Sequence, residues 1–349
     1  MKYRIEKVSA QWWMSVLIPV VAVIVTFLIT SVLILLAKAN PFEAYYYFLI
    51  APLSSQVSAL EVLVKATPLL LTGACATLAF SAGYWNIGGE GQFMAGAFAA
   101  TAAGILLQGV SPFFAIPIMI LVSFIAGVLW ALIPAWLKTK LAVDEVVTTL
   151  LFNSIILFLV SFVLNNIWRN PTTGWPQSPE ISATAMFIKL IPRSRLHLGF
   201  IIALVVILVE WFVLARTSFG LKIRAIGLSK EAAQFAGIKV DRNLFIVALV
   251  SGGIAGLAGG GDIAGIHFHL LEALGSGLGY SGIIVAMFAA LNPLAIIPSA
   301  LFIGLIDTGS QTVSRALGVP TYLGDVVQAT LLLVTLAMFV FQNYRVKRV

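Results

Sequence analysis

Charged residues are scarce in this chain of 349 amino acids. Only 10% of the residues are Asp, Glu, Lys or Arg, whereas 60% are hydrophobic. A soluble domain carries roughly 25% charged residues. The composition therefore excludes an ordinary soluble protein and predicts a polytopic membrane protein, in agreement with a mean hydropathy of +1.03.

Cysteine and histidine are also rare. The single cysteine, Cys75, lies inside an apolar run, which excludes a disulfide framework and a thiolate metal cage. All three histidines are predicted outside the membrane, so an intramembrane hydrolase has no evident general base. His267 and His269 have a spacing that suits a strand face, and no third strong ligand accompanies them. We therefore predict neither a metal site nor a cofactor.

A phosphate-binding loop of the G-x-x-x-x-G-K-[ST] type is missing as well. The chain is therefore expected not to hydrolyse nucleotide itself, and we predict a protein that is not an enzyme. The net charge of +7 could indicate a nucleic-acid partner. However, the basic residues occupy short segments between apolar runs, which membrane topology explains better. No nucleic-acid partner is predicted.

What the chain does contain is a series of apolar runs. About 20 such residues cross a bilayer, and on that basis the sequence predicts about ten transmembrane helices. They cover residues 14–37, 62–82, 92–110, 113–137, 146–165, 199–215, 243–262, 278–291, 294–310 and 322–342. The first run ends near an A-K-A sequence that resembles a signal-peptidase site. It is longer than the roughly 7–15 apolar residues of a signal peptide, so we expect a retained helix.

The distribution of Lys and Arg orients these helices. An N-terminus on the cytoplasmic side places 14 of the 21 basic residues in cytoplasmic segments, as the positive-inside rule requires. Those segments are 1–13, 138–145, 216–242 and 343–349. The C-terminus is then cytoplasmic, and the Pro-rich segment 166–198 is an external loop. We expect a single transmembrane domain over residues 1–349.

One predicted membrane segment contradicts the apolar pattern. Ser81 to Ala97 reads SAGYWNIGGEGQFMAGA and holds four glycines within nine residues, together with Asn86, Glu90 and Gln92. Polar groups and free backbone persist at bilayer depth only when packed in protein or lining a wet cavity. We therefore predict a broken helix beside a transport path. A second Gly-rich break at 259–282 is a faint hint of internal duplication.

Small residues also recur four apart, at Gly252, Gly256 and Gly260 and at Gly96, Ala100 and Gly104. This spacing is typical of closely packed membrane helices. The isolated charges Lys65, Glu210, Asp262, Asp307 and Asp325 are interpreted as interfacial residues near helix ends, with Glu210 able to pair toward Arg216. Glu145 is expected to pair with the basic residues Lys138 and Lys140.

The basic segment Thr217 to Asn243 predicts a short helix. Ser229 can cap it, Glu231 suits the positive end of its dipole, and Gly237 can stop it. A helix of about two turns is unstable alone, so something must hold it. The segment is either an ordinary topology-determining loop or a docking helix that offers Phe235 and Ile238 to a cytoplasmic partner.

Four stretches resemble permeases of ATP-binding-cassette importers. Glu231, Ala232 and Ala233, followed by Gly237, are similar to the Glu-Ala-Ala coupling loop of such permeases. YWNIGGEGQ at 84–92, DEVVTTLLFN at 144–153 and GYSGIIVAMFAALNPL at 279–294 resemble the branched-chain amino acid, ribose and nucleoside group, especially its nucleoside branch. These stretches are spread over residues 60–310. Asp144 departs from the pattern, where Asn is more usual.

The resemblance implies an all-α permease subunit in the inner or plasma membrane. Such a subunit works with a cytoplasmic ATPase, a second permease (a paralogue or a copy of itself) and an extracytoplasmic substrate-binding lipoprotein. Nucleosides are the implied substrate, and a ribose-type sugar is the alternative. The residues implied in ATPase coupling are Ser229, Glu231, Ala232, Ala233 and Gly237.

A nucleoside has a flat base and a hydroxylated sugar, which aromatic stacking and amide hydrogen bonds suit. The expected substrate-pathway residues are therefore Trp85, Asn86, Glu90, Gln92 and Asn153. Two alternatives remain open from the sequence. Glu90 and Asn86 could instead satisfy the backbone at broken helix ends, or the chain could be a proton-coupled secondary transporter with Glu90 or Asp262 as the proton carrier.

Overall fold

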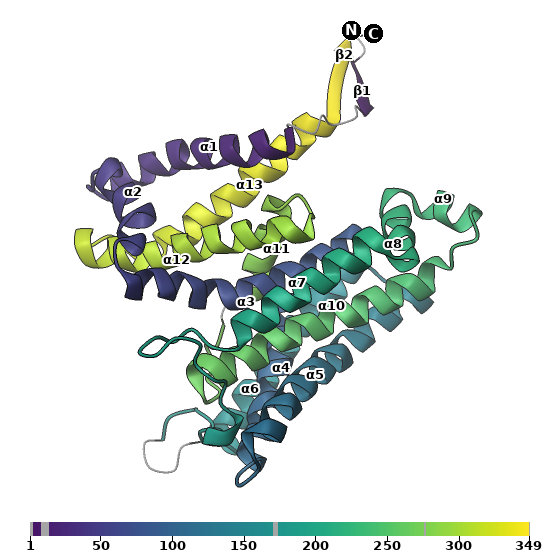
Figure 1. Cartoon of the computed structure of the whole chain (residues 1–349). Helices are drawn as coiled ribbons and strands as arrows, with labels where there is room; N and C mark the ends of the chain where they lie inside the picture. The colour runs from purple at the N-terminus through teal and green to yellow at the C-terminus, as the bar shows by residue number, and fades with distance from the viewer. Residues whose placement is uncertain (1–2, 8–13, 170–173, 276, 349) are drawn as a thin grey trace.

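The computed structural model describes residues 3–7, 14–169, 174–275 and 277–348, and most of them are helical (Figure 1). The long helices are α1 (Met14–Leu36), α3 (Gln56–Ser81), α4 (Gly89–Leu106), α5 (Pro112–Leu141), α6 (Glu145–Asn166), α7 (Gly199–Arg216), α10 (Val240–Asp262), α12 (Ile296–Leu317) and α13 (Leu323–Asn343). The shorter elements are α2 (Pro41–Leu49), α8 (Ser218–Leu228), α9 (Lys230–Phe235), α11 (Leu278–Phe288), the 3-10 turns η1 (Ala51–Leu53), η2 (Ala183–Ala185) and η4 (Pro293–Ala295), and the π-helical turn η3 (Ile263–His267).

Each of the ten predicted ranges coincides with a helix, but the helices differ in their ability to cross a bilayer. Among the described residues, seven helices are long and apolar enough to do so. These seven correspond to α1, α3, α5, α6, α7, α10 and α12. The apolar stretches of α11 and α13 are shorter. The helical membrane bundle is thus confirmed, and the number of ten spans stays a prediction.

Small residues bring α4, α5 and α10 into close contact, as the four-residue spacing predicts. A Cβ atom at Gly96 would overlap the backbone of Gly256, and one at Gly256 would overlap the backbone of α5 around Ser123. A Cβ atom at Gly252 would lie 2.8 Å from the carbonyl oxygen of Gly127. Backbones that approach so closely gain van der Waals contact without any hydrophobic driving force.

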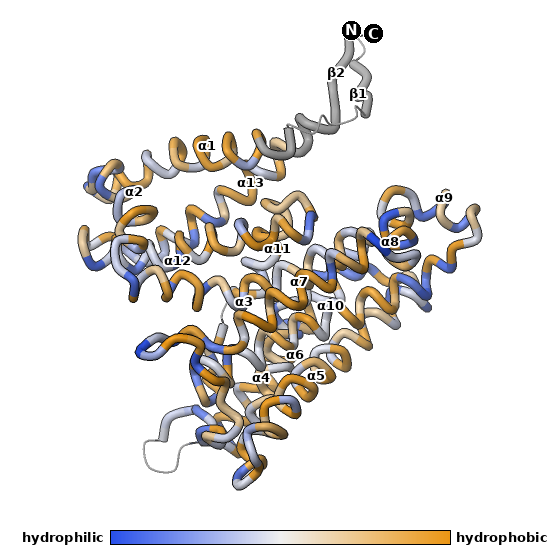
Figure 2. The backbone as a smooth tube through the Cα atoms, in the orientation of Figure 1, coloured by the Kyte–Doolittle hydropathy of each residue, from blue (hydrophilic) through white to orange (hydrophobic). Residues whose placement is uncertain are grey.

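A second group of helices, α1, α2, α12 and α13, packs beside this core on the far side of α3 (Figure 1). Its own apolar cluster includes Ile34, Phe48, Ile306 and Val327. Exposed apolar residues line the outer faces of α1, α5 and α7, whereas polar residues gather at α8 and α9 (Figure 2). A hydrocarbon environment accounts for these exposed apolar faces.

The two ends of the chain meet in a small antiparallel pair, β1 (Tyr3–Lys7) with β2 (Tyr344–Arg348). This pair departs from the all-α expectation, since two extended termini can satisfy each other's backbone groups. It also places both ends on one side of the molecule. Much of the predicted cytoplasmic segment 1–13 lies outside the described residues.

The connecting segments lie at opposite ends of α7. The segment 166–198 precedes it, and its described residues contain little helix apart from η2, as predicted. Its backbone is anchored to the bundle by the N–H groups of Ile181 and Phe187, which donate to Phe268 and Ala264 (both 2.8 Å). Helices α8 and α9 follow α7 at the other end (Figure 1).

The packing of α10 predicts unequal effects of two alanine substitutions in one helix. Gly256→Ala forces a methyl group into the backbone of α5, whereas at Gly261 the nearest atom to a new Cβ is 3.9 Å away. We expect Gly256→Ala to destabilise the protein by about 1–3 kcal/mol through overpacking. Gly261→Ala should leave the melting temperature in detergent equal or slightly higher, since alanine favours helix. Equal melting curves for the two variants would contradict this packing.

Candidate functional site

The break between α3 and α4 lies inside the bundle. Residues 82–88 are not helical, and α4 begins at Gly89. Three residues later, the Gln92 side chain packs 3.4 Å from the Cβ position of Gly252, twelve residues into α10. Twelve helical residues span about 18 Å at 1.5 Å per residue. The start of α4 therefore lies more than ~10 Å from the first residue of α10, measured along the α10 axis. Its first N–H groups have no intrahelical partners and need acceptors in protein.

Asn86 and Gln92 supply part of this need by pairing with each other. The Asn86 Nδ2 group donates to Gln92 Oε1 (2.9 Å), and Gln92 Nε2 donates to Asn86 Oδ1 (3.1 Å). Asn86 Oδ1 also accepts the Gly88 N–H (3.0 Å), and its Nδ2 group donates to Ser251 of α10 (3.1 Å). Both amide side chains are buried. The pair fixes the shape of the turn that enters α4.

Asn153 of α6 ties the same turn to a distant helix. Its Oδ1 atom accepts the Gly91 N–H (2.8 Å), while Nδ2 donates to the Ile87 carbonyl (3.1 Å) and to the Tyr280 hydroxyl (3.0 Å). The buried side chain uses its donors and its acceptor within protein. It therefore connects α6, the break and α11.

Glu90 makes the connection with α11 direct. Its Oε1 atom accepts the Gly277 N–H (2.8 Å) and its Oε2 atom accepts the Gly279 N–H (2.7 Å). Gly277 has a φ of +90°, which residues with a Cβ atom rarely adopt. A Cβ atom at Gly279 would overlap the backbone of Glu90. The two Gly-rich breaks that the sequence places far apart thus meet at one carboxylate.

Trp85 differs from these four residues because 47% of its surface is exposed. Its ring packs against Phe80, with 4.7 Å between ring centroids, and its backbone N–H faces Glu145 (3.5 Å). Glu145 in turn pairs with Lys138, which confirms the predicted ion pair. Of the five predicted pathway residues, four thus form one buried network that satisfies broken helix ends, and Trp85 lies at its edge. Their role toward a substrate stays a prediction.

A polar cavity of about 360 Å³ lies between α3, η3, α12 and α13. Lys65 and Asp307 form an ion pair across it (3.4 Å), and Asp325 and the buried Gln328 line it nearby. Asp307 lies in the middle of α12 rather than near a helix end, so its interpretation as an end residue was wrong. A sequence signal existed: Asp307, Gln311 and Ser314 recur on one face of a helix.

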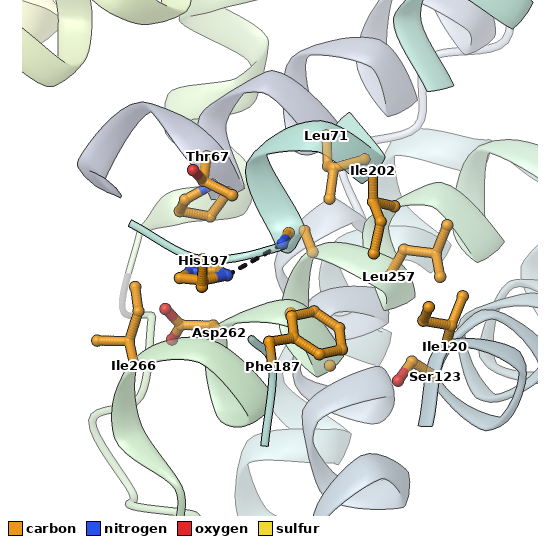
Figure 3. A pocket seen from close by; sticks show the side chains of 15 residues that line it. Thr67, Leu71, Ile120, Ser123, Phe187, His197, Ile202, Leu257, Asp262 and Ile266 are labelled. Carbon is orange, nitrogen blue, oxygen red and sulfur yellow. Dashed lines mark hydrogen bonds between the residues drawn. The ribbon is translucent and has the colours of Figure 1, made fainter. Parts of the chain in front are cut away.

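Asp262 lines both this cavity and a smaller pocket between α3, α7 and α10, which Figure 3 shows. There His197 is buried, contrary to its expected place in an external loop, and its Nδ1 atom accepts the Gly199 N–H (3.1 Å). Burial lowers the pKa of His197 to about 4, so the ring is neutral at pH 7. His197 Nε2 has no hydrogen-bond partner within the described residues, whereas Asp262 Oδ2 lies 3.6 Å from His267 Nε2.

Glu210 of α7 also departs from expectation. Its side chain is buried and neither of its carboxylate oxygens has a hydrogen-bond partner within the described residues. The expected pairing toward Arg216 is therefore wrong, because the side chain points into the bundle instead of along its surface. A buried carboxyl group without a counter-ion is disfavoured in its charged form.

The segment after α7 has the local structure predicted for it. Ser229 Oγ accepts the Ala232 N–H (3.1 Å) at the start of α9, and Gly237 follows the helix with a φ of +78°. Hydrogen bonds from its own backbone N–H and from Ser229 lower the pKa of Glu231, so this side chain is charged at pH 7. Ala233 is buried, whereas 96% of the Phe235 surface is exposed.

The network around Glu90 predicts a loss of stability on a conservative change. Glu90→Gln retains one acceptor but turns an amide N–H₂ toward a backbone N–H of α11. Hydrogen bonds to a charged group contribute about 1.5–3 kcal/mol, and we expect a loss of this order in thermal unfolding. Glu231→Gln removes the same charge from an exposed side chain and serves as the control. An unchanged melting temperature for Glu90→Gln would contradict the capping role.

Comparisons with known proteins bear on this architecture. Residues 58–336 match the family described as the branched-chain amino acid transport system permease component. The glucose ABC transporter permease TsgB13 of Haloferax volcanii is 31% identical, over 96% of this chain and 90% of that protein. The guanosine ABC transporter permease NupP of Bacillus subtilis is 30% identical, over 82% of each chain.

A third relative, the nucleoside ABC transporter permease NupB of Lactococcus lactis, is 29% identical over 94% of this chain and 92% of that protein. No solved structure gives a significant match. The family model covers most of the chain, including both breaks and the helices around the polar cavity. The chain therefore belongs to the branched-chain amino acid transport permease family and is a multi-pass membrane protein.

Proposed function

We propose that the chain is the membrane subunit of an ATP-driven importer that carries nucleosides. Two of the relatives described above are named for guanosine and nucleoside transport and one for glucose transport. A related simple sugar, such as glucose or ribose, is therefore the alternative substrate. The whole chain then acts as one permease domain, with 166–198 outside and 216–242 in the cytoplasm.

The solute path is proposed to include the polar cavity beside α12. An apolar bundle that encloses charged and amide groups provides hydrogen bonds where a hydroxylated solute must leave water. Asp325 forms no ion pair within the described residues, and Ser281 and Gln328 offer neutral polar atoms. The network around Glu90 lies next to this path, since Gly275 and Leu278 line the cavity just beside the two N–H groups that Glu90 accepts.

The observation that best supports ATP-driven transport is the exposed helix α9. It has only six residues, which is too short for stability in isolation. The Ser229 cap and the buried Ala233 hold it, while the nearly fully exposed Phe235 points away from the chain. An exposed aromatic side chain on a short capped helix suits a hot spot in a protein interface. We assign this surface, with Glu231, Ala232 and Gly237, to the ATPase subunit.

The remaining partners follow the same scheme. The permease would pair with a second permease, a paralogue or a copy of itself, and an extracytoplasmic lipoprotein would deliver the solute. Chemistry on ATP would then belong to the partner ATPase, and this chain would supply the path and the contact. Neither a metal nor a cofactor enters the scheme.

Replacing Phe235 tests the docking role. Phe235→Ala should weaken the association with the ATPase by about 2 kcal/mol, roughly 30-fold, as truncation of an interface hot spot does. Less ATPase should co-purify with the permease, and uptake should fall while the membrane level of the permease is unchanged. Phe113→Ala is the matched control, because it removes an exposed side chain of the same kind from the first turn of α5 and leaves α9 unchanged. Normal co-purification of the Phe235 variant would refute this role.

Uptake measurements test the substrate and the energy source. Proteoliposomes that hold the complete transporter should accumulate labelled guanosine when ATP is supplied, with unlabelled glucose and ribose as competitors. Effective competition by a sugar would favour the alternative substrate. Asp325→Asn, which keeps the size of a cavity side chain, should lower uptake about tenfold without changing solute binding to the lipoprotein.

The same vesicles distinguish a proton-coupled secondary transporter. In that alternative Glu90 or Asp262 would carry the proton, and Asp262 lies 3.6 Å from His267. Dissipating the proton gradient while ATP is maintained should leave uptake unchanged if ATP drives transport. Collapse of uptake under this condition would overturn the proposal.

A further inference from the structure

A surface cavity of about 390 Å³ lies where the end of α5 meets the start of α10. Trp136, Thr139 and Lys140 line it from the last turns of α5. Asp241, Arg242 and Phe245 line it from the first turns of α10. It belongs neither to the polar cavity beside α12 nor to the surface of α9.

The length of α5 places this cavity at the membrane surface. The helix has 30 residues, which corresponds to a length of roughly 45 Å at 1.5 Å per residue. A bilayer measures about 40–45 Å when its headgroup layers are included. The last turn of α5 therefore lies at the level of the lipid headgroups, where half-exposed tryptophans such as Trp136 are common.

The cavity is lined by two basic side chains that remain available. Lys140 and Arg242 are exposed and form no ion pair or hydrogen bond within the described residues. The neighbouring Lys138 is already paired with Glu145. Asp241 is the one acid among the described residues that line the cavity, so two positive charges face one negative charge there. The cavity as a whole therefore favours an anion.

An apolar strip leads from the bilayer to this cavity. Leu129, Leu132, Ile133 and Trp136 are exposed and recur at the spacing of one helix face. Lys140 continues the same face by one further turn. An occupant that fits the whole surface has an anionic head next to Lys140 and Arg242 and an apolar tail along α5. We propose that this surface binds an anionic phospholipid.

Native mass spectrometry of the full-length permease in detergent can test the site. Phosphatidylglycerol and phosphatidylcholine with the same acyl chains are titrated in parallel. Wild-type protein should bind phosphatidylglycerol about tenfold more tightly, because each basic residue near an anionic surface contributes to attraction. The double variant Lys140→Gln, Arg242→Gln should lose this preference and keep its binding of phosphatidylcholine.

The double variant Lys222→Gln, Arg224→Gln is the matched control, since it removes two exposed charges from α8, outside the cavity. It should keep the preference for phosphatidylglycerol. An unchanged preference in the Lys140 and Arg242 variant would overturn the proposal. So would a variant that binds both lipids as the wild type does but no longer co-purifies with its ATPase, because the surface would then be a protein interface.

Discussion

A single carboxylate inside an apolar bundle determines how two broken segments of this chain meet. Glu90, in the first turn of α4, accepts backbone N–H groups at the start of α11 with both of its oxygens. Two helices that begin inside a membrane protein leave orphan N–H groups that lipid cannot satisfy. The Glu90 carboxylate accepts two such N–H groups at the start of α11. Its negative charge also lies at the positive end of the α11 dipole. Without such a partner, a helix start at this depth would be strongly disfavoured.

The consequences extend to the polar cavity. Because α11 starts at Glu90, Gly282 comes to lie against Thr72 of α3, and the chain then continues into α12 and α13. These two helices supply Asp307 and Asp325 to the cavity, while α3 supplies Lys65. The capping contact thus positions, through a few turns of helix, charged groups that are distant in the sequence. Glu90 can therefore influence the proposed solute path through the packing of α11, without any contact with the solute.

Local signals in the sequence were enough for part of this structure. Hydropathy located the helices, and the Ser229 cap and Gly237 stop of α9 were predictable because both depend only on neighbouring residues. The end of α12 was placed too early, at residue 310, because Gln311 and Arg315 lower the hydropathy of a helix that continues to Leu317. The Lys65–Asp307 pair and the burial of His197 and Glu210 depend on which helices pack together. A single sequence does not reveal that pairing.

The polar groups inside the bundle fall into two kinds with different consequences. Asn86, Gln92, Asn153 and Glu90 use their hydrogen-bonding capacity on backbone and on each other. Such saturated groups hold helix ends in place, and a passing solute would have to break bonds to engage them. Asp325 and Gln328 face a cavity and retain capacity for new bonds. A solute that exchanges water for hydrogen bonds would gain more from the second kind. The cavity beside α12 thus retains more hydrogen-bonding capacity for a solute than the glycine-rich break, whose polar groups are already bonded within the protein.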